Sequence, residues 1–114
     1  MSNLLNPNFA WAILLIAGLL EPVWAGAMKA SDGFTKLWPA VLTIVAAWSS
    51  FALLGLSLKA LPVGTAYAVW TGVGAVGTAI LGIIMFNEPA NAVRLGSIGL
   101  IVAGIAGLKL VGGE

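Results

Sequence analysis

The chain has 114 residues, of which 61% are hydrophobic and 8% are charged, and its mean hydropathy is +1.07. Soluble domains carry about 25% charged residues, so this composition predicts an integral membrane protein with almost no sequence left for a soluble domain. The net charge of +1 gives no electrostatic footprint for nucleic acid. Without cysteine or histidine there is no disulfide and no credible transition-metal site, and we expect no metal and no cofactor.

Charged residues divide the chain into four apolar runs. The first run, residues 9–28, has a length that matches a bilayer core of roughly 30 Å. Residues 37–58 and 60–87 are uncharged, and the shorter stretch 95–108 becomes a full crossing if Arg94 and Lys109 reach opposite interfaces. The runs do not alternate as barrel strands do. We predict an all-α membrane protein in which residues 1–114 form a single four-helix domain, with spans near 9–28, 37–58, 63–86 and 92–111.

Glu21 is the one charged residue within the first run. At that depth an ionisable group costs about 2.5 kcal/mol or more, and such groups usually face a bundle interior, a cavity or an ion pathway. The alternative is a carboxyl group that is permanently protonated or paired inside the bundle. No Lys or Arg lies inside another predicted span to pair with it.

Helical spacing places polar and aromatic side chains on faces that can share a cavity with Glu21. Indole, phenol and hydroxyl groups donate the hydrogen bonds that a buried carboxylate needs. For the aromatic residues, packing or an interfacial belt is the alternative, and it fits Trp11 and Trp38 near span ends. The three faces carry Gly18, Glu21, Trp24, Ala25 and Met28; Thr43, Ala47 and Ser50; and Tyr67, Trp70, Thr71, Gly74 and Thr78.

Glycine is abundant in these spans, with fifteen in the chain, and small residues let helices approach closely in lipid. Gly72 and Gly74 near the middle of the third span predict a kink or hinge. In the fourth span, Ser97 and Gly104 lie seven residues apart on one face. That face serves either intramolecular packing or a dimer seam.

Four segments carry a resemblance to a known family. They are GLLEPVWA at residues 18–25, GFT at 33–35, LPVGTAYAVWTGVG at 61–74 and GLK at 107–109. Together they resemble the small multidrug resistance family over most of the chain, from about residue 11 to 109. The tryptophan three residues after Glu21, and the absence of a tyrosine at Ala47, resemble its guanidinium-exporter subtype more than the drug-exporting one.

This resemblance implies an antiparallel homodimer of dual topology, in a bacterial inner membrane, that exchanges protons for a cation. Carried over by motif, Glu21 binds proton or substrate, and Trp24, Ser50, Tyr67 and Trp70 line the site. One departure is Pro22, where the family usually has an aliphatic residue. Proline leaves the Gly18 carbonyl without its helical partner, which predicts either a kink in the first span or an extra acceptor for a cationic ligand.

The expected activity follows from one carboxylate that binds either a proton or a cation. Low dielectric favours its neutral form, so protons and substrate compete, and this competition couples export to the proton gradient. Guanidinium is planar, its edge suits paired carboxylates, and its faces stack on Trp or Tyr. We expect a proton-coupled exporter of guanidinium and small substituted guanidinium cations. The alternatives are a multidrug exporter of quaternary ammonium or lipophilic cations, a non-transporting interaction subunit, and one half of a paired heterodimer; an enzyme is not expected because no nucleophile–base pair is present.

Charge counting supports the dual topology. Lys59 and Lys109 fall on one side of the predicted bundle, whereas Lys29, Lys36 and Arg94 fall on the other. Two positive charges against three is a weak bias for orientation. A second, inverted copy would also supply the repeat from which small transporters commonly build alternating access. We therefore predict antiparallel pairs in which both Glu21 side chains face one cavity, the competing arrangement being a parallel dimer.

Overall fold

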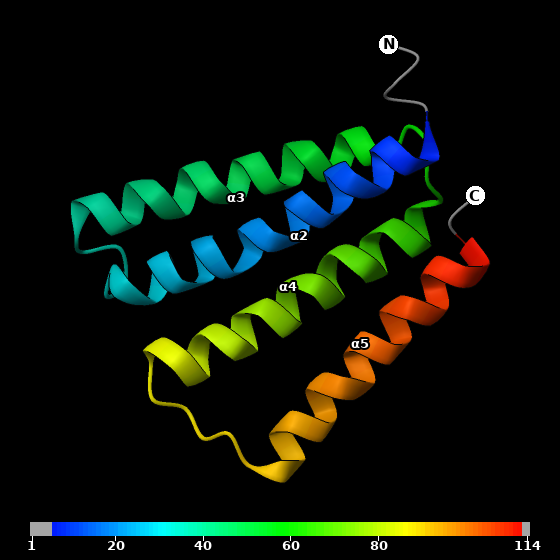
Figure 1. Ribbon diagram of the computed structural model, residues 1–114. Helices are drawn as coiled ribbons and strands as arrows, with labels where there is room; N and C mark the ends of the chain where they lie inside the picture. Colours follow the sequence, from blue (N-terminus) through cyan, green and yellow to red (C-terminus); the bar gives the residue numbers. More distant parts are fainter. Residues whose placement is uncertain (1–5, 113–114) are drawn as a thin grey trace.

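The computed structural model describes residues 6–112, which form four long helices (Figure 1). They are α2 (Pro7–Ala30), α3 (Leu37–Ser57), α4 (Val63–Met85) and α5 (Ala92–Gly112). All four are long and apolar enough to cross a membrane, which confirms the all-helical architecture with four candidate spans. Observed bounds differ from the expected spans by at most two residues, and α3, α4 and α5 begin at the expected residues. Helix α2 begins earlier because Pro7 occupies its first turn and the Asn6 side chain accepts a hydrogen bond from the Asn8 backbone N–H at 2.8 Å.

The helices lie side by side in the order α3, α2, α4, α5, forming a flat layer (Figure 1). Its extents are 41 × 36 × 17 Å, so the layer is less than half as thick as it is wide. Helix α2 packs on both α3 and α4, whereas α5 packs mainly along α4. None of the described α5 residues is buried. A large part of the surface is therefore apolar, as expected for helices that face lipid or another chain.

The buried core lies in one half of this layer, where the start of α2 meets the link at residues 58–62 and the start of α4. It includes Trp11, Leu14, Leu61, Val69 and Trp70. The expectation that Trp11 belongs to an interfacial belt was wrong. Trp11 is only 5% exposed because it packs inside the core, and the Lys109 ammonium lies 5.0 Å from its ring centroid. Trp38, at the start of α3, is 76% exposed and fits the lipid-facing position expected of it.

The turn between α2 and α3 is organised by Ser31. Its backbone N–H bonds the Ala27 carbonyl, its hydroxyl donates to the Met28 carbonyl at 2.7 Å, and the Phe34 N–H donates to that hydroxyl at 3.0 Å. Ser31 is fully buried, and these contacts satisfy groups that the end of α2 would otherwise leave unpaired. The turn therefore fixes how α3 returns alongside α2.

Candidate functional site

Glu21 lies near the middle of α2 and is partly buried within one chain. Trp24, one turn later on the same helix, donates from its indole Nε1 to Oε2 of Glu21 at 3.2 Å. No other described residue donates a hydrogen bond to this carboxylate, and the one ion pair among residues 6–112 joins Arg94 to Glu88. Glu21 therefore keeps acceptor capacity for a cation or a proton.

Helix α4 reaches the Glu21 side chain because Gly74 has no Cβ. A Cβ built on Gly74 would lie 2.6 Å from the Glu21 Cβ and 2.9 Å from its Oε1, closer than real side chains approach. One turn later, a Cβ on Gly77 would lie 2.6 Å from the Pro22 ring. The absence of side chains at Gly74 and Gly77 thus lets the site carboxylate and the adjacent proline pack directly on the α4 backbone.

Glycines on α2 accept side chains of α4 in the same way. A Cβ on Gly18 would lie 2.8 Å from the Val73 Cβ, and one on Gly26 would lie 2.7 Å from a Leu81 methyl carbon. Glycines alternate with larger residues across the two helices, so the α2–α4 contact is close on both sides of Glu21. The burial of the Glu21 carboxylate between α2 and α4 therefore depends on small residues from both helices.

The side chain of Ser50 on α3 forms hydrogen bonds with both α2 and α4. Its hydroxyl donates to the Ala17 carbonyl of α2 at 2.7 Å and accepts from the Trp70 indole Nε1 of α4 at 2.9 Å. Ser50 is fully buried and Trp70 is 7% exposed. Ala17 precedes Glu21 by one helical turn. Ser50 and Trp70 therefore hold the backbone of α2 near the carboxylate, and neither bonds the carboxylate itself in this conformation.

Replacement of Ser50 by alanine is expected to lower stability. The buried Trp70 N–H would lose its acceptor, and an unsatisfied buried polar group costs about 1–3 kcal/mol. Thermal unfolding of the detergent-solubilised protein, followed by tryptophan fluorescence, measures this loss. The matched control is Ser49→Ala, because the Ser49 hydroxyl is exposed and bonds the Val45 carbonyl of its own helix. Equal melting temperatures for the two variants would show that this bridge adds no stability.

Tyr67 occupies a different position from the other aromatic residues expected at the site. Its side chain is 57% exposed, and its ring centroid lies 5.5 Å from that of Trp70. Phe51 of α3 lies 5.6 Å from Trp70 on centroid distances and is also exposed. Within one chain, Tyr67 therefore lies at the surface of the layer.

The residues expected at a hinge lie within continuous helices. Helix α4 continues through Gly72 and Gly74, and α2 continues through Pro22. A Cβ on Gly72 would lie 3.0 Å from Ile105, so Gly72 serves the contact between α4 and α5. The hinge itself stays a prediction.

The residues expected at a dimer seam lie on α5. A Cβ on Gly104 would meet no described atom beyond its own helix within 4 Å. The exposed Ser97 hydroxyl bonds the Val93 carbonyl of α5 at 2.8 Å. Gly104 therefore does not pack against another helix of its own chain, and that alternative was wrong for this residue. The dimer seam stays a prediction.

Sequence reasoning missed several contacts near the site. The Ala17 carbonyl gives no sequence signal because any residue has one. The pairing of Pro22 with Gly77 needs the register between two helices, which periodicity within one helix does not supply. The ion pair of Glu88 with Arg94 joins a link to the first turn of α5, so helical spacing does not predict it.

Comparison with known proteins identifies the family. The family model described as "Small Multidrug Resistance protein" matches residues 9–101. The chain belongs to the small multidrug resistance family. It is 59% identical over 101 residues to a protein of Yersinia pseudotuberculosis serotype I named "Guanidinium exporter", covering 89% of this chain and 97% of that one. Proteins with the same name from Salmonella typhimurium and Escherichia coli K12 are 60% and 59% identical over 101 residues, covering 89% of this chain and 96% of each relative.

Family membership and the four apolar helices together make this chain an integral inner membrane protein. The match begins at residue 9, close to the start of α2, and includes Glu21 and every residue that surrounds it. The resemblance expected from the motifs is therefore confirmed.

Proposed function

We propose that this protein is a proton-coupled antiporter that exports guanidinium and small substituted guanidinium cations. The observation that carries the proposal is the partly buried Glu21 carboxylate, which has one indole donor and no cation partner among the described residues. A carboxylate left in this condition can bind either a proton or a cation. The guanidinium exporters that are about 60% identical to this chain favour guanidinium as the cation.

The surroundings of Glu21 suit a small planar cation. Guanidinium N–H groups match carboxylate oxygens, and its faces stack on aromatic rings such as that of Trp24, which bonds Glu21 directly. Glu21 packs on the α4 backbone at Gly74, and this contact leaves little room on that side of the carboxylate. A bulky quaternary ammonium ion has no donors to offer and would need a larger aromatic cage.

Currents in proteoliposomes test the substrate. We expect guanidinium to evoke a proton-coupled current and tetraethylammonium to evoke little. Equal currents would favour the multidrug exporter of quaternary ammonium ions. A protein that gives neither a current nor uptake of either cation would favour a non-transporting subunit, since uptake also detects a one-for-one exchange that moves no net charge. Empty liposomes under the same proton gradient supply the baseline.

Binding of guanidinium should weaken as the pH falls. A proton neutralises the Glu21 carboxylate and removes the charge that attracts the cation, so the apparent affinity drops by up to about tenfold for each pH unit below the titration midpoint. Tryptophan fluorescence reports binding, since Trp24 bonds the carboxylate directly. An affinity that stays flat over the whole pH range in which the protein remains folded would mean that proton and cation use separate sites.

We further propose that two chains pair in antiparallel orientation. One chain is a thin layer with one site carboxylate, its α5 has no buried residue among those described, and Tyr67 is exposed. An inverted second copy would place its own Glu21 opposite the first and cover these faces. Ser97 and Gly104 on the open face of α5 are the proposed seam, because close helix contact in lipid needs small residues.

Labelling of single cysteines tests this orientation. The chain has no native cysteine, so Leu58→Cys in the second link and Ala90→Cys in the third give clean probes at opposite ends of the helices. Both positions are exposed, and neither substitution changes a charge. We expect each probe to be labelled from outside intact cells in roughly half of the molecules, because the charge bias is weak. Nearly complete labelling of one probe with almost none of the other would establish a parallel arrangement.

A further inference from the structure

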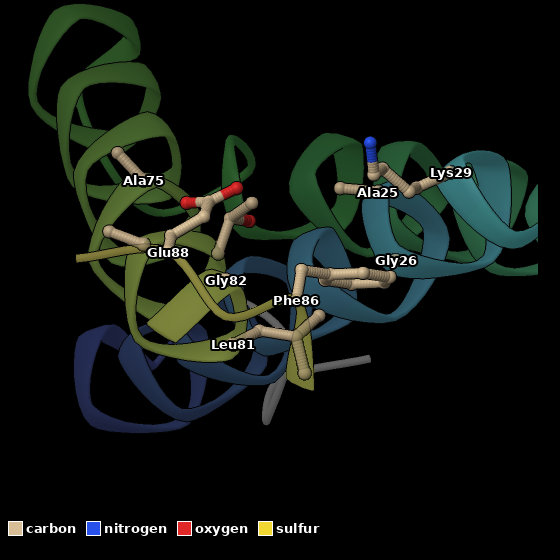
Figure 2. A pocket seen from close by; sticks show the side chains of 10 residues that line it. Ala25, Gly26, Lys29, Ala75, Leu81, Gly82, Phe86 and Glu88 are labelled. Carbon is tan, nitrogen blue, oxygen red and sulfur yellow. The ribbon is translucent and has the colours of Figure 1, made fainter. Parts of the chain in front are cut away.

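A cavity of about 360 Å³ lies between the second halves of α2 and α4. At its inner end are Ala25, one turn beyond Glu21, and Ala75, which follows the Gly74 that packs on Glu21. At its outer end are Lys29 from α2 and Glu88 from the link after α4, on either side of Phe86 (Figure 2). This cavity, here called the passage, therefore runs from one helical turn beyond Glu21 to the end of the helices, and Glu21 is not among the residues that line it.

Two charged side chains, Lys29 and Glu88, line the mouth of this passage, and a third, Arg94, is paired with Glu88. The Lys29 ammonium lies 6.0 Å from the centroid of the Phe86 ring. The Glu88 carboxylate accepts a hydrogen bond from Arg94 Nη1 at 3.0 Å, and both side chains of this ion pair are partly exposed. The mouth thus has two positive charges and one negative charge. Without Glu88, a cation would meet Lys29 and Arg94 with no opposite charge beside them.

The link holds Glu88 at this position. Its backbone N–H bonds the Gly82 carbonyl at 3.1 Å, which folds the link back over the last turn of α4. Gly82 has no Cβ, and the Glu88 carboxyl group occupies the space that a Cβ there would need. Asn87 has a φ of 58°, the left-handed conformation that reverses the chain at this point. The carboxylate is therefore fixed on the cavity wall between Gly82 and Arg94.

We propose that Glu88 is a specificity-determining residue for cation access, because its carboxylate offsets the positive charge of Lys29 and Arg94 at the mouth of the passage. The inference rests on the proposed function, since it concerns how a guanidinium ion reaches Glu21. Clefts with low-dielectric walls concentrate the field of the charges that line them, and such fields change association rates by about 10-fold to 1000-fold in strong cases. With one charge altered among three, we expect an effect at or below the low end of that range, about 3- to 10-fold.

The experiment compares initial guanidinium currents in proteoliposomes for wild type, Glu88→Gln, Lys29→Gln and the double variant. Guanidinium is kept below saturation, and ionic strength is set with potassium chloride to about 0.01 M or about 1 M, where the Debye length is roughly 30 Å or 3 Å. At low salt, Glu88→Gln should be about 3- to 10-fold slower than wild type and Lys29→Gln should be faster. The double variant restores the net charge of the mouth and should recover most of the wild-type rate. At high salt the four rates should converge.

The double variant distinguishes an effect of the net charge at the mouth from an effect of losing the ion pair with Arg94. It lacks the ion pair with Arg94 as Glu88→Gln does, so a double variant that stays as slow as Glu88→Gln would overturn the proposal. Wild-type rates for all four proteins at low salt would also overturn it. If Glu88→Gln does not assemble, a Lys29→Gln rate at or below wild type decides against it. A wild-type protein with neither a guanidinium current nor guanidinium uptake would contradict the proposed function as well, whereas robust wild-type transport with unchanged variants contradicts only the role of Glu88.

Discussion

Glu21→Gln is expected to abolish proton-coupled guanidinium transport while the protein still folds and assembles. The amide is nearly isosteric with the carboxyl group, and its oxygen can still accept the Trp24 hydrogen bond, which is 3.2 Å long in the native protein. It carries no charge and cannot exchange a proton for a cation. Removal of one partner of a buried, hydrogen-bonded charge pair costs about 2–5 kcal/mol in binding, and Glu21 is only partly buried within one chain, so guanidinium affinity should fall by roughly 30-fold or more.

Two controls show whether the loss of transport comes from the missing carboxylate or from a failure to assemble. Gel filtration in detergent should show the same oligomer for Glu21→Gln as for wild type, and Glu21→Asp should retain part of the current because it keeps a carboxylate. The role proposed for Glu21 fails if a correctly assembled Glu21→Gln protein drives guanidinium transport at the wild-type rate.

The second large effect is expected from Gly74→Ala. The added methyl group would overlap the Glu21 Cβ and Cγ, which are backed by the packed helix α2. Either α2 and α4 separate or the carboxylate leaves its position. Overpacking of this kind costs about 1–3 kcal/mol of stability, and a displaced Glu21 would lose transport beyond what instability explains. Thermal unfolding and proteoliposome currents on the same preparation measure both quantities.

Gly55→Ala on α3 is the matched control. It makes the same substitution in a helix, but a Cβ there would meet no described atom beyond its own helix within 4 Å. Alanine favours helix more than glycine does, so this control should be neutral or slightly stabilising. If Gly74→Ala behaves like Gly55→Ala in both measurements, the close approach of α4 to Glu21 is not required for transport.

The sequence by itself predicted the number of helices and their bounds to within two residues, and it marked Glu21 as the principal candidate for a site residue, which stays a prediction. These features depend on local properties. A run of apolar residues long enough to cross a bilayer has few alternatives, since backbone groups in lipid must bond within a helix or a closed barrel. A lone carboxylate in such a run is visible because its cost is large wherever the helix packs.

The tertiary structure decided which groups surround Glu21. Helical spacing placed Trp24, Ser50 and Trp70 on suitable faces, but only the packing of three helices directs Trp70 to Ser50 and Ser50 to the Ala17 carbonyl. It likewise set Gly74 against Glu21. It also buried Trp11, whose position near a span end had indicated an interfacial role. The periodicity of one helix defines its own faces and carries no information about the register and rotation of its neighbours, which follow from how all the side chains pack together.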